Sequence, residues 1–148
     1  MNAARPAGLL RRLGALFYDA LLLGALWLVA AVPAVLLHGG AIRRGDGAAY
    51  WLFELYLAGV ALAFFTFCWS RGGQTLGMAA WGLRVEDAAG RPPAWPRALL
   101  RAALALGGLA NLCLLVGLRP WHERLSGTYT VHRPAARRRP ESAARHSP

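Results

Sequence analysis

An uninterrupted apolar run near its start constrains this chain more than any other feature. Residues 13–37 are 25 consecutive positions that contain one charged side chain, Asp19. At about 1.5 Å of rise per residue, a helix of this length crosses the hydrocarbon core of a bilayer. The run exceeds the roughly 7–15 apolar residues of a signal peptide. We therefore predict an integral membrane protein that retains this segment as its first span.

Two further apolar segments follow. Residues 49–70 predict a second span with one charge, Glu54, and with Trp51 and Trp69 near its ends, where interfacial aromatic residues are common. Residues 102–118 are uncharged but barely long enough to cross, and a glycine pair interrupts them. The expected fold class is an all-α integral membrane protein with two transmembrane helices plus a third apolar segment, either re-entrant or spanning.

Changes in composition divide the rest of the chain. Residues 1–12 form a short arm with three arginines, and residues 71–101 form a motif-rich loop after the second span. The predicted membrane domain covers residues 13–132 and closes with a motif at 121–132. Residues 133–148 are basic and lack apolar periodicity, which predicts a disordered tail.

Short elements are expected on both sides of the third apolar segment. Residues 75–81 place apolar side chains at helical spacing, which predicts a short helix in the interface plane. Residues 83–86 and 128–132 alternate as strands do, and they can pair only if both lie on one side of the membrane. Pro33 is expected to kink or end the first helix. Four polar residues are interpreted as caps and turn formers: Gln74, Thr75, Ser126 and Thr128.

Arginine supplies all of the basic charge. The net charge is +10, and none of the 17 basic residues is a lysine. Because the arginines flank apolar segments, we interpret them as marking the cytoplasmic side and expect no nucleic-acid partner. If the third segment crosses, eight arginines lie on one face and nine on the other; if it returns, the division becomes fifteen against two. The positive-inside rule favours a returning segment and a cytoplasmic N-terminus.

Asp19 is the most unusual residue of the first span. A charged residue inside a spanning helix costs roughly 2.5–3.5 kcal/mol on insertion scales, so it usually faces a partner or a water-filled cavity. Arg12 precedes Asp19 by seven positions, nearly two turns, so the two side chains share one side of the helix. Their separation along the helix axis is about 10 Å.

Five motifs in this order resemble a known family. They are Arg12 with Asp19, Gly-Gln-Thr-Leu-Gly-Met at 73–78, Gly-Leu-Arg-Val at 82–85, Arg-Ala-Leu-Leu-Arg at 97–101 and Trp-His-Glu-Arg-Leu-Ser-Gly-Thr at 121–128. Over residues 8–132 the chain is similar to the RDD family of small bacterial membrane proteins, which implies the bacterial inner (plasma) membrane. The resemblance maps the family's arginine and two aspartates onto Arg12, Asp19 and Glu123. The glutamate keeps the charge of the second aspartate on an arm one methylene longer.

Two functions remain open for this set of charges. In one, Arg12, Asp19 and Glu123 form a structural network in a membrane scaffold or accessory subunit. In the other, which the resemblance also implies, a small oligomeric transporter or Na⁺/H⁺ exchanger uses Asp19 to bind a proton or sodium ion. Such short segments enclose no pathway alone, so we expect a homo-oligomer or a membrane partner protein within the lipid bilayer.

Other polar residues have two readings each. His122 either relays protons beside Glu123 or is simply hydrogen-bonded near the interface. Glu54 either reaches interfacial water or belongs to an ion pathway. Cys68 and Cys113 lack disulfide or metal spacing and are interpreted as packing residues. No nucleophile elbow, zinc motif or catalytic carboxylate pair appears, so we expect neither an enzyme nor a bound cofactor or metal.

Overall fold

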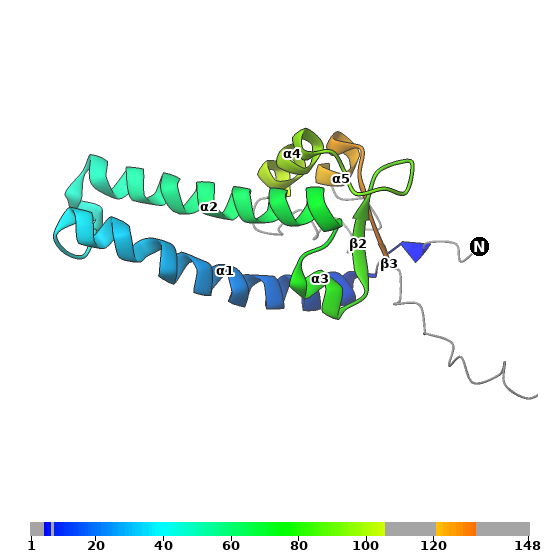
Figure 1. The fold of residues 1–148 in the computed structure, drawn as a ribbon, viewed down its shortest axis with the longest axis horizontal. Helices are drawn as coiled ribbons and strands as arrows, with labels where there is room; N and C mark the ends of the chain where they lie inside the picture. Colours follow the sequence, from blue (N-terminus) through cyan, green and yellow to red (C-terminus); the bar gives the residue numbers. More distant parts are fainter. Residues whose placement is uncertain (1–4, 7, 106–120, 133–148) are drawn as a thin grey trace, which may run out of the picture.

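Two long antiparallel helices form the frame of the molecule (Figure 1). The computed structural model describes residues 5–6, 8–105 and 121–132. Helix α1 (Leu9–His38) and helix α2 (Ala48–Gly72) are joined by a short connection that contains the 3-10 turn η1 (Arg44–Asp46). We call this connected end the loop end. The opposite end, where α1 begins and α2 ends, carries all other described elements, and we call it the motif end.

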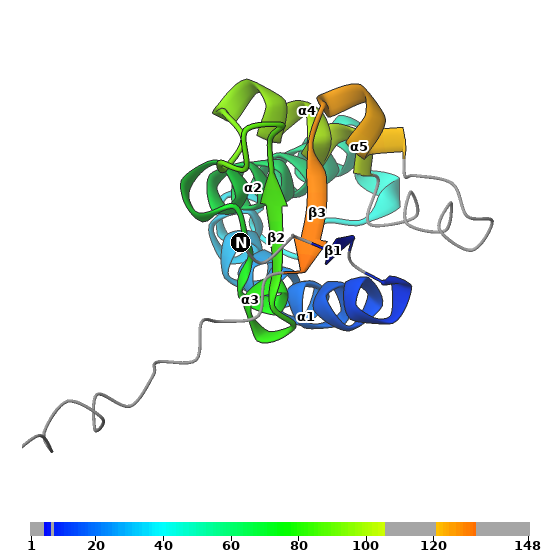
Figure 2. The same cartoon turned by 90° about the vertical axis from the view of Figure 1, so that its right-hand side faces the viewer.

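A small sheet and three short helices make up the motif end. These elements are β1 (Arg5–Pro6), α3 (Leu76–Ala80), β2 (Leu83–Glu86), α4 (Trp95–Ala105), α5 (Trp121–Ser126) and β3 (Tyr129–His132). The strands form an antiparallel sheet in the order β1-β3-β2 (Figure 2). Leu83 is opposite His132 and Glu86 is opposite Tyr129, which fixes the register of the central pair. The predicted pairing of these two segments is confirmed.

Both long helices are long and apolar enough to cross a membrane. Their large apolar side chains point outward along much of their length, as lipid-facing residues do, for example Leu28 at 74% and Leu55 at 69% exposure. Inside the pair, the indole Nε1 of Trp27 donates to the Leu57 carbonyl at 2.9 Å, which ties the helices together. Pro33 lies inside α1, which continues to His38, so the prediction that the helix could end there is wrong.

The predicted class needs one correction. The described chain is mostly helical, but the three-stranded sheet means that it is not all-α. Strands β2 and β3 pair at the motif end, and Leu83 and Val85 of β2 belong to the buried core there. The predicted second span and the predicted helix at 75–81 both appear, as α2 and α3.

The buried core lies at the motif end, between the helix pair and the sheet. Its members are Ala15, Trp69, Met78, Leu83, Val85 and Ala98, with Phe65, Trp81 and Ala102 packed against them. Gly73 ends α2 with a φ of 68°, a conformation that favours glycine. Its carbonyl accepts a hydrogen bond from Val85 N at 2.6 Å, so the end of α2 is joined directly to β2.

The third apolar segment lies largely outside the described residues, as do Cys113 and the basic tail at 133–148. The structure describes the helices on either side of this segment. Helix α4 ends at Ala105 and α5 begins at Trp121, and both helices lie at the motif end (Figure 1). The division into arm, membrane domain and tail stays a prediction.

Candidate functional site

The centre of the site is the carboxylate of Glu123, which α5 carries into the motif end. Arg12, in the first turns of α1, donates from Nη1 to Glu123 Oε1 at 2.5 Å, and the two residues are 111 positions apart in sequence. The backbone N–H of Thr130 donates to the same oxygen at 3.2 Å. Arg12 is 7% exposed and Glu123 is 4% exposed, so this is a buried ion pair. It joins the start of α1 to both α5 and β3.

A second arginine, Arg101 on α4, completes the charge network. Its Nη1 and Nη2 each donate at 2.8 Å, to Thr128 Oγ1 and Thr130 Oγ1 respectively. Its Nη2 also lies 3.7 Å from Glu123 Oε1. The guanidinium carbon stands 5.0 Å from the ring centroid of Trp69, a cation–π contact with α2. Arg101 therefore connects α4, α2 and β3 to the same carboxylate.

Arg101 belongs to the Arg-Ala-Leu-Leu-Arg motif at 97–101, but the sequence alone predicts no role for it. Its partners lie 27 and 29 positions further on, across the third apolar segment. The one signal available was the pair of threonines at 128 and 130, which alternate on one face of a predicted strand. Two hydroxyl groups on one face of a strand predict a hydrogen-bond donor opposite them if that face is buried.

Burial and neighbouring charges shift the pKa values of Glu123 and Arg101, but both groups stay charged at neutral pH. Burial alone raises the pKa of Glu123, but Arg12 and Arg101, with hydrogen bonds from Thr130 and Arg12, bring that pKa below its ordinary value of 4.5. Burial lowers the pKa of Arg101 to about 10, although Glu123 opposes this shift, so the guanidinium stays charged at neutral pH. Among the described residues, two guanidinium groups thus lie against one carboxylate.

Asp19 has different partners. Its Oδ2 accepts a hydrogen bond from Thr75 Oγ1 at 2.5 Å, and its Oδ1 accepts one from Gly77 N at 3.0 Å. Thr75 is also the N-cap of α3, where its hydroxyl accepts from Met78 N at 3.2 Å. The predicted cap role of Thr75 is therefore confirmed, and its second role as a donor to Asp19 was missed. The aspartate attaches the start of α3 to the side of α1.

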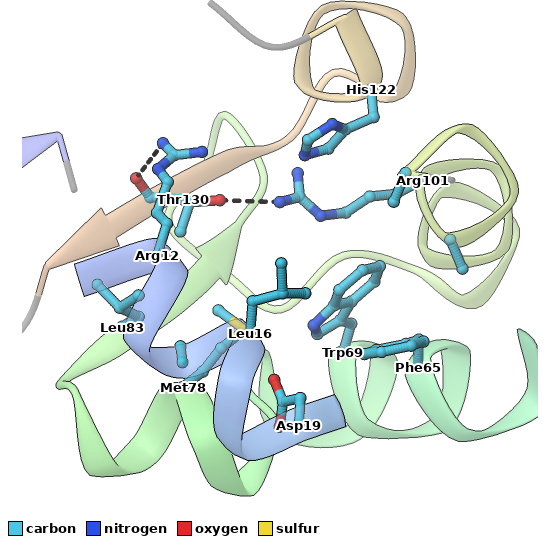
Figure 3. A pocket seen from close by; sticks show the side chains of 13 residues that line it. Arg12, Leu16, Asp19, Phe65, Trp69, Met78, Leu83, Arg101, His122 and Thr130 are labelled. Carbon is cyan, nitrogen blue, oxygen red and sulfur yellow. Dashed lines mark hydrogen bonds between the residues drawn. The ribbon is translucent and has the colours of Figure 1, made fainter. Parts of the chain in front are cut away.

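The three predicted charges do not form one cluster around a shared centre. Arg12 meets Glu123, whereas Asp19 lies deeper along α1 and bonds to α3. Between these two places lies a cavity of about 100 Å³ that both Arg12 and Asp19 line (Figure 3). Its walls include apolar side chains of both long helices, notably Leu16, Phe65 and Trp69.

The two supporting residues lie apart from each other. His122 is 2% exposed and lines the cavity beside Arg101 (Figure 3). Burial, with a further contribution from Arg101, lowers its pKa to about 3, so the imidazole is neutral at physiological pH and does not titrate near neutrality. Glu54 is exposed in the second turn of α2, next to the loop end where this helix begins.

The described residues do not group side chains into a set of metal ligands. Across 8–105 and 121–132, no three His, Cys, Asp or Glu side chains are grouped in a way that could hold one. Both oxygens of Asp19 already accept hydrogen bonds, and Glu123 faces two arginines.

Comparison with known proteins supports the resemblance seen in the sequence. A family model described as the RDD family matches residues 6–119. The chain belongs to the RDD family. This RDD protein has no match among curated proteins or solved structures. The matched range includes Arg12, Asp19 and Arg101 and ends just before α5, so it does not reach Glu123.

Proposed function

We propose that this RDD protein is a structural or accessory component of the bacterial inner membrane, in which buried charges fasten the motif end to the spanning helices. The observation that carries the proposal is the bridge from Arg12 to Glu123, with Arg101 against the same oxygen. These three residues come from α1, α5 and α4, so one carboxylate holds three separate elements together.

The chemistry of the acids supports a structural role. A carboxylate between two guanidinium groups is already neutralised and offers no attraction to a cation. Removing one partner from such a buried network leaves an unpaired charge, which typically costs 3–5 kcal/mol. The burial and pairing of Glu123 therefore support a structural role for this acid, which needs no ion to pass.

We extend the proposal to topology. Strand β3 pairs with both β1 and β2, so segments before the first span, after the second and after the third apolar segment share the motif end. The arginine distribution of fifteen against two, which holds if the third segment returns, supports a cytoplasmic motif end. In this arrangement the protein is multi-pass with a cytoplasmic N-terminus, and the third segment returns to the side from which it started.

The partners we propose are the lipid bilayer and another membrane chain, either a second copy or a different protein. The outward-facing surfaces of α1 and α2 are apolar and available for such contacts. Ala20 and Gly24, four positions apart on α1, permit a close helix approach. We propose no enzymatic activity and no nucleic-acid partner.

A second candidate is Na⁺/H⁺ exchange at Asp19. One observation favours it: this carboxylate lies within a spanning helix and lines the cavity, where an ion could reach it. Against it, Thr75 and Gly77 already donate to both oxygens, so ion binding would require α3 to move.

Reconstitution separates the two candidates. Purified protein in liposomes is exposed to a sodium or pH gradient, and flux is followed for the wild type, Asp19→Asn, Glu123→Gln and the control Glu54→Gln. Unfolding in detergent is measured for the same proteins. We expect no gradient-driven flux from any of them, with a clear loss of stability for Glu123→Gln and almost none for Glu54→Gln. Flux by the wild type that disappears in a stably folded Asp19→Asn variant would establish exchange and overturn the structural proposal.

A further inference from the structure

Helix α4 presents an apolar face to its surroundings and keeps a charged side chain in the interior. Its buried side carries Ala98 and Arg101, which are 0% and 4% exposed. The opposite side is exposed and uncharged, and it consists of Pro96, Leu99, Leu100 and Ala103, with Trp95 at its border. A surface helix in water has the reverse arrangement, with its polar residues outward. The outward face of α4 is therefore expected to be covered by an apolar partner.

The exposed apolar surface continues onto α5. Trp121 and Leu125, one turn apart on this helix, are 45% and 66% exposed. The indole Nε1 of Trp121 donates to the Leu104 carbonyl oxygen at 2.7 Å, so this side chain lies against the end of α4. We call the combined surface the α4–α5 face, and its members are Trp95, Leu99, Leu100, Ala103, Trp121 and Leu125. Two helices of the motif end thus share one apolar surface.

The level of this face along the spanning helices indicates which partner covers it. Figures 1 and 2 both show α4 and α5 on the side of α2 that faces away from α1, with α4 beside the last turns of α2. The contacts agree, because Arg101 stacks over Trp69 and Ala102 packs against the core that contains this tryptophan. At the same level of α2, Phe67 is 62% exposed and the Arg71 guanidinium lies 5.4 Å from its ring centroid. An outward aromatic ring with an arginine beyond it is typical of the level at which a spanning helix reaches the lipid headgroups.

The charges at the motif end favour an anionic headgroup. Of the four acids described there, three are buried, and the side chain of Asp87 is 13% exposed and lies against Arg91, 3.8 Å away, with Arg97 nearby. Arg97 lies on α4 at the border of its outward face, and Arg124 directly precedes Leu125 on α5. Exposed guanidinium groups therefore outnumber exposed carboxylates on the described motif end, which attracts anionic phospholipid. The exposed arginines are Arg11, Arg71, Arg91, Arg97 and Arg124.

We propose that the α4–α5 face lies in the headgroup region of the bilayer and binds anionic phospholipid there. Trp95, Leu99 and Leu100 contact the first methylene groups of the acyl chains, while Arg97 and Arg124 pair with the phosphate. This inference goes beyond the structural role proposed above, because the buried charges join the motif end to the spanning helices whether or not lipid binds. It requires neither a particular side of the membrane nor a second chain.

The position of the face is measured in liposomes with an environment-sensitive fluorophore on a single cysteine. In a chain that carries Cys68→Ala and Cys113→Ala, Leu100→Cys places the label on the face. Ala89→Cys, in the exposed turn between β2 and α4, is the matched control. Phospholipid brominated on its acyl chains should quench the label at position 100 and leave the label at position 89 nearly unchanged, whereas iodide in the water should do the reverse. Unfolding transitions confirm that both labelled chains are folded.

The lipid class is measured on the full chain, with its cysteines intact, by native mass spectrometry in detergent micelles. The probes are phosphatidylglycerol and, as the zwitterionic match, phosphatidylcholine with the same acyl chains. We expect phosphatidylglycerol to bind about tenfold more tightly, and Arg97→Gln combined with Arg124→Gln to remove most of this preference, since each arginine near an anionic surface contributes a severalfold gain. Arg97→Lys combined with Arg124→Lys keeps the charges and should keep the preference. Arg43→Gln combined with Arg44→Gln, at the loop end, should leave it unchanged.

Each alternative result overturns the proposal in a different way. Equal quenching by iodide at positions 100 and 89 would show that the face lies in water. Shielding of position 100 from iodide without quenching by brominated lipid would show that a protein, such as a second copy of the chain, covers the face. No preference for phosphatidylglycerol, or an equal loss of preference in the loop-end pair, would show that the face does not select anionic lipid. The flux and unfolding measurements above decide none of these results, so either proposal can fail while the other stands.

Discussion

At the scale of single residues, burial decides what His122 can do. From its sequence position beside Glu123, one of the two readings of His122 is a proton relay near neutral pH, since the ordinary pKa of histidine is 6.5. In the fold its ring is enclosed next to Arg101, and Arg12 contributes further positive charge while Glu123 opposes it. The lowered pKa of about 3 keeps His122 neutral near pH 7, which favours the hydrogen-bonded reading over a proton relay.

This shift predicts how stability depends on pH. Between pH 6.5 and about 3 the unfolded chain protonates His122 while the folded chain does not, so acidification through this window favours unfolding. From pH 7 to pH 5 the free energy of unfolding should fall by up to about 2 kcal/mol. The contribution of Glu123, whose folded pKa is lowered, is lost only below its unfolded value of 4.5 and lies outside this range.

Unfolding titrations in mixed detergent micelles at pH 7, 6 and 5 measure this dependence. His122→Gln should flatten it, and His38→Gln is the matched control because it changes an exposed histidine at the loop end. An equal pH dependence in His122→Gln and wild type would show that the imidazole is accessible to protons in the fold.

At the scale of elements, α3 depends on a close approach to α1. A Cβ on Gly77 would meet the Ala15 carbonyl oxygen and lie 2.7 Å from Asp19 Oδ1. Neither group can yield easily, because one is helix backbone and the other accepts the Gly77 N–H. The glycine therefore allows the aspartate to hold α3 in place.

Gly77→Ala should accordingly displace α3 and lower the free energy of unfolding by about 1–3 kcal/mol, the usual cost of forcing atoms into a packed site. Gly24→Ala is the matched control, because a Cβ at that position of α1 meets nothing within 4 Å. Unfolding titrations of the two variants give the comparison. Equal stability of both would mean that α3 does not pack tightly on α1.

Local patterns predicted many of these elements and few of their contacts. The second span, the helix after Thr75 and the two pairing strands followed from apolar periodicity and alternation, which are local signals. The bonds from Asp19 to Thr75 and from Arg101 to Thr128 span 56 and 27 positions, and no local pattern encodes them. The family resemblance predicts that Arg12 and Glu123 belong to one set of charges, but their direct contact, across 111 positions, comes from the structure.

At the scale of the whole molecule, the sheet ties distant parts of the chain to one end of the helix pair. Arg5 is opposite His132, so the residues that precede the first span and those that end the closing motif are neighbours. A chain with this sheet cannot place its two termini on opposite sides of the membrane unless the sheet opens.

Topology reporters test this arrangement. A reporter active only in the cytoplasm, fused after residue 148, should be active, and one active only in the periplasm should be silent. The same pair fused within the loop end, after Gly45, should give the reverse pattern. A periplasmic C-terminus would be incompatible with the pairing of β1 and β3 and would make the returning third segment wrong.

The central claim, that buried charges hold the motif end on the spanning helices, is tested most directly by a double-mutant cycle on Arg12 and Glu123. The free energy of unfolding is measured for wild type, Arg12→Gln, Glu123→Gln and the double variant. Because each single change removes the shortest ion contact of a buried charge, the double variant should lose less than the sum of the two, with a coupling energy of at least about 1.5 kcal/mol. Losses that simply add, with a coupling near zero, would contradict the structural role of this pair.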